Sequence, residues 1–328
     1  MQLHDGHLLA ASGDHTISVT PVEGIRAEAD AAVLRASAAG GFVPAAARTL
    51  SGHNEQVLQL HASADRLASC SSDGAVLLWS LSRGTVLRRF QLGAYCVQLA
   101  GRTLFAGGEG VDPIRAHHTT TGAVVASFAD REPPLGVTSA LQLRETTLAA
   151  ANTFSRSQLR VWDVLSGVLT DRFSFPAFTR GVRCLQLQPR ALIAGCANGW
   201  IFFCDLRSGR FEKRLAHAEC VNSLALLPSE HTLLSAGDDA LVKLTDLRTL
   251  SSYASHKLKR VVYSAIADEE RLYAGCDDGV VRCFDYSAQA QATLDKRNER
   301  SGGFTSAQQR ALSAALQASR ARQDSTFR

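Results

Sequence analysis

The chain has 328 residues, of which 45% are hydrophobic and 20% charged, so it has enough apolar side chains for a core and is not a disordered chain. Its net charge of +4 is too small to indicate a dedicated nucleic-acid-binding protein. No apolar run approaches the length of a membrane-spanning helix, and residues 1–10 lack the pattern of a signal peptide. The eight cysteines form no CxxC pair, which favours buried thiols in a reducing compartment. We therefore expect a cytoplasmic or nuclear protein.

Short apolar runs recur along the chain in groups of three. The first run of a group often reads Leu-Gln-Leu or a close variant, as at residues 58–60, 97–99, 141–143 and 185–187. A second run that ends in small residues follows, and then a third run. The runs are rich in Val, Ile, Leu and aromatic residues and are bounded by Gly, Asp, Asn or Ser, a pattern typical of strands and turns.

The third runs repeat at a nearly constant interval. They end near Thr20, Trp79, His118, Trp162, Cys204, Thr245 and Phe284, about 40 residues apart after the first group, which is the period of a four-stranded propeller blade. Gly52, His53, Asp73, Trp79 and the pair Trp162-Asp163 resemble the signature of WD-repeat β-propellers. We therefore predict an all-β fold, a seven-bladed WD-repeat β-propeller in residues 1–294, with a short C-terminal helical extension.

Two segments do not fit the repeat. Residues 24–47 form an alanine-rich insertion in blade 1, and they could be a helix over residues 26–38 or a low-complexity loop. Residues 295–328 are a basic tail in which Leu312 and Leu316 lie one turn apart on a short expected helix. Because Met1 already falls in the innermost strand of blade 1, we expect residues 290–294 to form the outer strand of blade 7. The junction of blades 7 and 1 is then unlocked or covered by another molecule.

His53, Ser69, Asp73 and Trp79 include the residue types of a nucleophilic triad. Their spacing instead resembles a structural network of the family, and this resemblance implies that Asp73 accepts from His53, which bonds Ser69, which bonds the indole of Trp79. Blade 6 keeps three members, His217, Ser235 and Asp239, with Thr245 in place of the Trp, and blade 7 keeps His256 and Asp278. No other constellation has the spacing of a catalytic, cofactor or metal site, so we expect no enzyme.

The family resemblance also implies where partners bind, namely just before the innermost strands. These positions are Gln56, Tyr95, Ser139, Arg183, Asn222 and Val262. Tyr and Arg are enriched at interaction hot spots, which favours Tyr95 and Arg183. Positive charge is expected nearby from Arg180, Lys257, Lys259 and Arg260. In the tail, Leu312 and Leu316 could dock in a partner's groove.

Three functions stay open from the sequence. The first is a non-enzymatic protein-interaction scaffold, a subunit of a larger multiprotein assembly. The second is a substrate receptor of a cullin–RING ubiquitin ligase, because Asp239, Asp246 and Arg248 resemble the box that binds the propeller adaptor, although Thr245 departs from its Trp. The third is a ribonucleoprotein subunit that contacts RNA through the basic tail. None of these requires a membrane, a cofactor or a small-molecule substrate.

Overall fold

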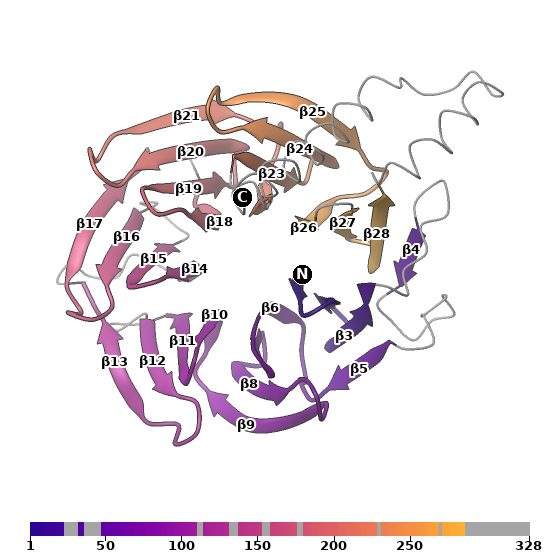
Figure 1. Ribbon diagram of the computed structural model, residues 1–328, viewed down its shortest axis with the longest axis vertical. Coiled ribbons are helices and arrows are strands. Elements are labelled where there is room, and N and C mark those ends of the chain that lie inside the picture. The colour runs from indigo at the N-terminus through magenta and orange to yellow at the C-terminus, as the bar shows by residue number, and fades with distance from the viewer. Residues whose placement is uncertain are drawn as a thin grey trace, which may run out of the picture.

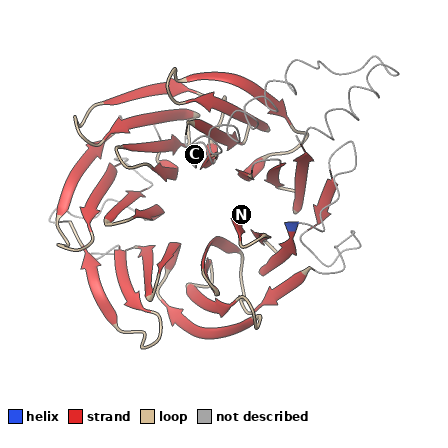
Figure 2. Ribbon diagram, in the orientation of Figure 1, coloured by secondary structure: helices blue, strands red, loops and turns tan. Residues whose placement is uncertain are grey.

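The computed structural model describes residues 1–22, 32–35, 47–109, 114–130, 137–152, 158–175, 180–227, 231–268 and 271–285. These residues form seven four-stranded antiparallel sheets arranged as blades around a common centre (Figure 1). Strands and turns make up nearly all of the described chain (Figure 2). The predicted seven-bladed propeller is therefore confirmed, whereas the predicted C-terminal helix lies outside the described residues.

Each blade runs from an inner strand near the centre of the ring to an outer strand at the rim. The inner strands of blades 1 to 7 are β1 (Gln2–His4), β6 (Val57–Ser63), β10 (Ala94–Ala100), β14 (Thr138–Arg144), β18 (Val182–Leu187), β22 (Val221–Leu226) and β26 (Val262–Ala267). The second strands are β2 (His7–Ala11), β7 (Arg66–Ser71), β11 (Thr103–Gly108), β15 (Thr147–Asn152), β19 (Ala191–Cys196), β23 (Thr232–Gly237) and β27 (Arg271–Cys276).

The two remaining strands of each blade lie toward the rim. The third strands are β3 (Thr16–Pro21), β8 (Ala75–Ser80), β12 (Ile114–His118), β16 (Gln158–Asp163), β20 (Trp200–Asp205), β24 (Leu241–Asp246) and β28 (Val280–Asp285). The outer strands are β5 (Arg48–Ser51), β9 (Thr85–Gln91), β13 (Val124–Phe128), β17 (Leu169–Ser174), β21 (Phe211–Leu215), β25 (Ser251–Lys257) and β4 (Ala32–Arg35).

The ring is closed by a strand from the alanine-rich insertion. β4 pairs antiparallel with β28, with Arg35 opposite Val280 and Leu34 opposite Val281, so blade 7 takes its outer strand from the segment between β3 and β5 (Figure 1). The expected unlocked junction is therefore wrong, and so is a helix over residues 32–35. Residues 290–294 lie outside the described residues. Helix propensity is a weak preference, and here the bonds to the open edge of β28 outweigh it.

The hydrophobic core lies between adjacent blades, because most sheets are covered on both faces. Between blades 1 and 2, for example, Ile17 and Leu50 of one sheet pack against Leu67 and Trp79 of the next. All six residues of β8 are buried. Continuous apolar strands rather than alternating ones are what a sheet covered on both faces requires.

Glutamines of the inner strands connect neighbouring blades, which explains the recurring Leu-Gln-Leu run. Gln98 in β10 accepts from the backbone N–H of Leu143 in β14 at 2.5 Å and donates to its carbonyl at 3.0 Å. Gln2 makes the same pair of bonds to Ala62, at 2.6 and 3.2 Å. Gln59 accepts from Val97, and Gln142 from Leu187. The inner strands of blades 1 to 4 thus each bind the next one through a glutamine side chain as well as through core packing.

Candidate functional site

Six of the seven inner strands begin with an irregularity in their pairing to the second strand. In each case the second residue of the inner strand is skipped in the register. A bulge of this kind leaves one residue unpaired and redirects its side chain. The six skipped residues are Leu58, Tyr95, Ser139, Arg183, Asn222 and Tyr263. We call them the bulge ring, and the side of the disc where the inner strands begin the upper face.

The bulge ring combines exposed and tethered side chains. Leu58, Tyr95, Arg183 and Tyr263 are exposed, with Tyr263 reaching 60%. Ser139 and Asn222 are half-buried because they bind the neighbouring blade. The hydroxyl of Ser139 donates to the carbonyl of Val182 at 2.6 Å, and the amide of Asn222 donates to the carbonyl of Val262 at 3.0 Å and to Asp238 at 2.6 Å.

Two of the partner-facing positions expected from the sequence, Gln56 and Val262, are not members of the bulge ring. Val262 is fully buried, and its neighbour Tyr263 holds the exposed position in blade 7. Gln56 is exposed, but it precedes the strand, and Leu58 is the member of the ring in blade 2. A bulge inserts one residue without a sequence signal of its own, so the choice between neighbouring positions could not be made from the repeat alone. Leu312 and Leu316 lie outside the described residues.

Charged groups surround the bulge ring on the upper face. The hydroxyl of Tyr95 donates to Glu109 in the following turn at 3.2 Å, and partial burial together with this contact raises the pKa of Tyr95. Arg180 lies exposed before β18, and Lys257, Lys259 and Arg260 lie exposed where the chain enters β26. The positive charge expected beside blades 5 and 7 is therefore at the surface and open to a partner.

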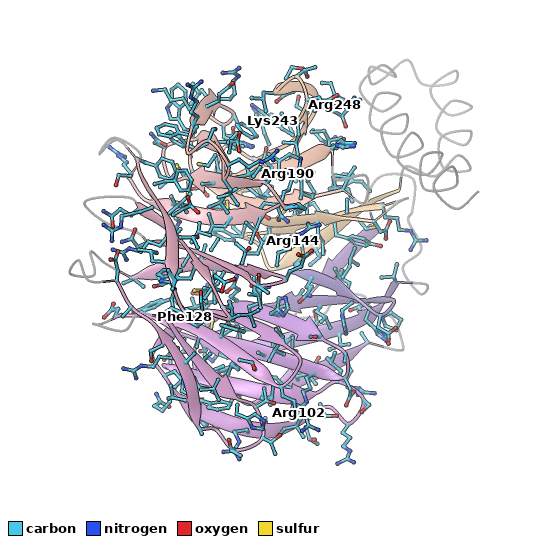
Figure 3. The ribbon with its side chains drawn as sticks, turned by 60° about the vertical axis from the view of Figure 1, so that its left-hand side comes forward. Arg102, Phe128, Arg144, Arg190, Lys243 and Arg248 are labelled. Carbon is cyan, nitrogen blue, oxygen red and sulfur yellow. The ribbon has the colours of Figure 1, made fainter. Side chains whose placement is uncertain are left out.

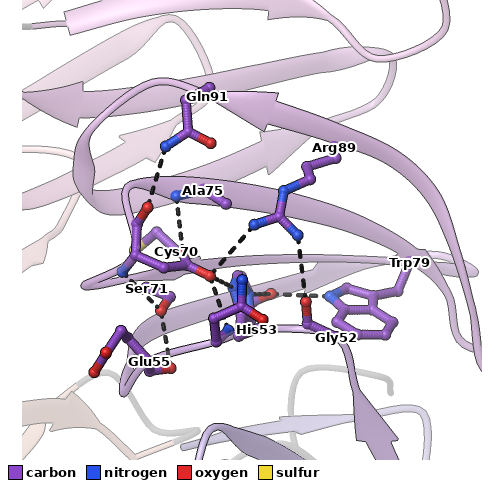
Figure 4. A network of polar contacts seen from close by, with 12 residues as sticks. Gly52, His53, Glu55, Cys70, Ser71, Ala75, Trp79, Arg89 and Gln91 are labelled. Carbon is purple, nitrogen blue, oxygen red and sulfur yellow. Dashed lines mark hydrogen bonds and ion pairs between the residues drawn. The ribbon is translucent and has the colours of Figure 1, made fainter.

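The His–Ser–Asp set of blade 2 lies inside the sheet rather than at a surface cleft (Figure 4). His53 Nε2 lies 2.7 Å from the hydroxyl of Ser69, which also accepts from the indole N–H of Trp79 at 2.9 Å. His53 Nδ1 faces Asp73 at 3.4 Å, and Asp73 accepts from the backbone N–H of Asn54 and Ala75. Burial lowers the pKa of His53, while Asp73 opposes the shift. Because Ser69 has no exposed surface, it cannot reach a substrate.

Blade 6 contains the same set without the tryptophan. His217 lies 2.8 Å from Asp239 and 2.9 Å from the hydroxyl of Ser235, and burial lowers its pKa. Thr245, in the position of the Trp, bonds instead to the hydroxyl of Ser252 in the outer strand at 2.9 Å. In blade 7, Asp278 accepts two bonds from the guanidinium of Arg282, and His256 packs edge-on against Phe284. The network is thus complete with its Trp in blade 2 and lacks the Trp in blade 6, while in blade 7 the two retained residues make these other contacts.

The residues of the possible ligase-adaptor box divide between two environments. Asp239 belongs to the buried network of blade 6. Asp246 ends β24 and Arg248 lies in the turn that follows, on the opposite, lower face. The guanidinium of Arg248 donates to both carboxylate oxygens of Asp246, at 2.7 and 3.1 Å. The lower face also carries arginines at the first hairpins of blades 3, 4 and 5, namely Arg102, Arg144 and Arg190, which follow one another along successive blades (Figure 3).

Among the described residues, no group of three or more His, Cys, Asp and Glu side chains has the geometry of a metal site. The same part of the chain contains no helix that is long and apolar enough to cross a membrane.

Comparison with known proteins agrees with this architecture. A family model described as WD domain, G-beta repeat matches residues 46–80 and 209–246, which cover most of the blades that hold the two networks. An uncharacterized WD repeat-containing protein of Schizosaccharomyces pombe is 29% identical over 117 residues, 34% of this chain. The Periodic tryptophan protein 2 homolog of Dictyostelium discoideum is 24% identical over 272 residues, 77% of this chain. The matched region spans 29% of the length of each relative.

A solved structure shows the same fold. The crystal structure of the computationally designed Ika8 protein has a TM-score of 0.64 and 18% identity, with 87% of this chain and 82% of that chain covered. This likeness concerns the fold alone. Taken together, the seven blades, the buried His–Ser–Asp–Trp network and the matched repeats show that the chain is a seven-bladed β-propeller that contains WD repeats.

Proposed function

We propose that this protein is a non-enzymatic interaction scaffold that works as a subunit of a larger assembly and binds a partner protein across the bulge ring. The observation that carries the proposal is the exposure of Leu58, Tyr95, Arg183 and Tyr263 on the upper face. Each of them is the second residue of an inner strand. Exposed large side chains at equivalent positions of several blades, all on the upper face, favour an interaction site there. Tyr and Arg are also the residue types that contribute most to binding.

The scaffold supports binding because it holds the backbone that carries these side chains in place. The inner strands are joined to each other by Gln98, Gln2 and their equivalents, and the ring is closed by β4. Anchors that are already ordered lose little conformational entropy on association. Arg183 and the cations near blades 5 and 7 favour a partner segment that carries acidic as well as apolar side chains.

Site-specific photocrosslinking tests this proposal. A photoreactive phenylalanine analogue replaces Tyr263 in the bulge ring and, as a matched control, Tyr253, an exposed tyrosine of the outer strand β25. Both proteins are introduced into cells of the source organism, irradiated and analysed by mass spectrometry. We expect defined protein adducts at position 263 and none of the same proteins at position 253. Equal adducts at both positions, or none at position 263, would contradict the proposal.

The ligase-receptor function is the second candidate, and the exposed guanidinium of Arg248 on the lower face favours it. It predicts that Arg248→Ala abolishes capture of the propeller adaptor while thermal unfolding stays unchanged. Retention of the adaptor by Arg248→Ala, or failure of the unaltered chain to capture it, would exclude this function. The RNA contact through residues 295–328 stays a prediction, because that tail lies outside the described residues.

A further inference from the structure

The outer strands differ in whether they contain charged side chains, which affects their ability to pair with another chain. Six of the seven contain at least one charged side chain within their bounds: Arg48 in β5, Arg88 and Arg89 in β9, Asp171 and Arg172 in β17, Glu212, Lys213 and Arg214 in β21, Lys257 in β25, and Arg35 in β4. β13 reads Val-Val-Ala-Ser-Phe and contains none. Charged side chains on edge strands prevent pairing with other chains, so β13 lacks a protection that the other rim strands have.

β13 lies at the rim of blade 3, and its outer edge pairs with no other strand among the described residues (Figure 1). Its inner edge pairs with β12, with Ala126 opposite Ala116 and Phe128 opposite Ile114. Phe128 is buried in the core, whereas Val124 and Val125 are more than half exposed. Two exposed valines beside an edge that no described strand pairs with are the features of a strand that can accept another strand.

We propose that β13 is a self-association site, which pairs antiparallel with β13 of a second copy of this chain. A two-fold axis at Ala126 places Val124 opposite Phe128 of the second copy and Val125 opposite its Ser127, so no like charges meet. The same operation on β9 would place Arg88 against Arg88, and on β21 it would place Lys213 against Lys213. Like charges directly opposite each other destabilise a strand pair. β13 is thus complementary to itself where these two rim strands repel their own copies.

The size of the contact sets its strength. Five residues extend about 17 Å at 3.4 Å per residue. A strand pair of this length buries less surface than the interface of a stable dimer. We therefore expect a weak, concentration-dependent dimer with a closed two-fold arrangement rather than an open polymer. This surface lies on the rim, apart from the bulge ring, so the two sites can be occupied at the same time and tested separately.

Analytical ultracentrifugation of the full chain tests the proposal, at about 1 µM to about 1 mM, the range in which weak complexes dissociate. Val125→Lys and Ser127→Lys each place a charge on the edge and are expected to weaken dimerisation at least tenfold. The matched control is Leu87→Lys, because Leu87 occupies the equivalent bulged position of β9 and is 47% exposed against 55% for Val125. This control is expected to leave dimerisation unchanged, and thermal unfolding verifies that all three variants fold.

Three results would overturn the proposal: a monomer at every concentration, a dimer that survives Val125→Lys, or a dimer weakened equally by Leu87→Lys. A monomer that captures a different protein through Val125 would also overturn it, because the edge would then serve another partner. Replacement of Tyr263 is expected to leave dimerisation intact, which keeps this test separate from that of the bulge ring.

Discussion

The hydroxyl of Ser69 lies 2.9 Å from the indole nitrogen of Trp79 and accepts a hydrogen bond from its N–H inside blade 2. Trp162 takes the equivalent place in blade 4, but the residue that corresponds to Ser69 is Ala150. The indole nitrogen of Trp162 is buried and has no hydrogen-bond partner among the described residues. A cavity of about 10 Å³, at the lower limit for one water molecule, lies between Trp162 and Ala150.

This difference between the blades predicts opposite effects of two substitutions. Ser69→Ala leaves the buried N–H of Trp79 and a nitrogen of His53 unpaired, so we expect it to lower the free energy of unfolding by about 1–3 kcal/mol. Ala150→Ser adds a hydroxyl that the cavity can hold and that can bind Trp162, so we expect it to raise that free energy by about 1 kcal/mol. Urea titrations measure both. Loss of stability in Ala150→Ser would mean that the cavity cannot accommodate the hydroxyl.

His61 predicts how stability depends on pH. Its Nδ1 accepts the backbone N–H of Leu99 in the next blade at 3.1 Å, and burial, together with the charge of His4, lowers its pKa to about 4. The unfolded chain binds a proton near pH 6.5 and the folded chain only near pH 4, so this contribution is complete above pH 6.5 and decreases as the pH falls toward 4. One such proton changes stability by about 1.4 kcal/mol per pH unit.

His61→Gln tests this contribution, because a glutamine oxygen can accept the same N–H, as Gln59 does for Val97. We expect the variant to bind about one proton fewer on unfolding than the unaltered chain does between pH 6.5 and 4. The remaining acid dependence comes from His53, His217 and His256, whose pKa values burial also lowers. Urea midpoints measured across this range give the slope. An unchanged slope in His61→Gln would show that this histidine does not titrate as described.

Arg183 predicts the ionic character of the partner site. It is the exposed cation of the bulge ring, so Arg183→Glu should weaken the binding of an acidic partner by about 10–100-fold and make its affinity less sensitive to salt. Arg190→Glu, an exposed arginine of the same blade on the lower face, serves as the control. Titration calorimetry at two salt concentrations, with the partner identified by crosslinking, measures both. Equal losses in the two variants would indicate a general charge effect.

The closing strand predicts a local effect of deletion. Removal of residues 26–38 takes away β4 and leaves β28 with an open edge. We expect the amide protons of β28 to exchange with solvent faster, while those of β24, the third strand of blade 6, keep their protection. Hydrogen–deuterium exchange with mass spectrometry resolves the two strands. Unchanged protection of β28 would show that β4 contributes little to blade 7.

Much of the fold followed from periodic signals. The interval between Trp79, Trp162 and their equivalents predicted seven blades, whereas the network of His53, Ser69 and Asp73 was implied by the family resemblance. The number of blades could be predicted because each repeat must bury the same apolar faces, which imposes a period on the sequence. The glutamine contacts between blades were visible as a repeated Leu-Gln-Leu run, although their role required the structure.

The remaining features depend on contacts between distant segments. Ala32–Arg35 lies in an alanine-rich stretch, and only the open edge of β28 selects the strand over the helix. Tyr263 rather than Val262 reaches the surface because of a bulge, which carries no residue type of its own. Such features come from pairing geometry, which composition and local pattern do not encode.

Ring closure by β4 has a consequence for how the chain acquires its structure. Arg35 is synthesised early, but its partner Val280 emerges only with the last blade. The segment that completes the circle therefore cannot be placed until nearly the whole propeller has left the ribosome. Until then the disc has two open sides, one on blade 1 and one on the most recently formed blade, and each exposes apolar surface to other nascent chains. Docking of the last blade and capture of residues 32–35 should thus be the final, slowest event of folding, because it joins the most widely separated parts of the sequence.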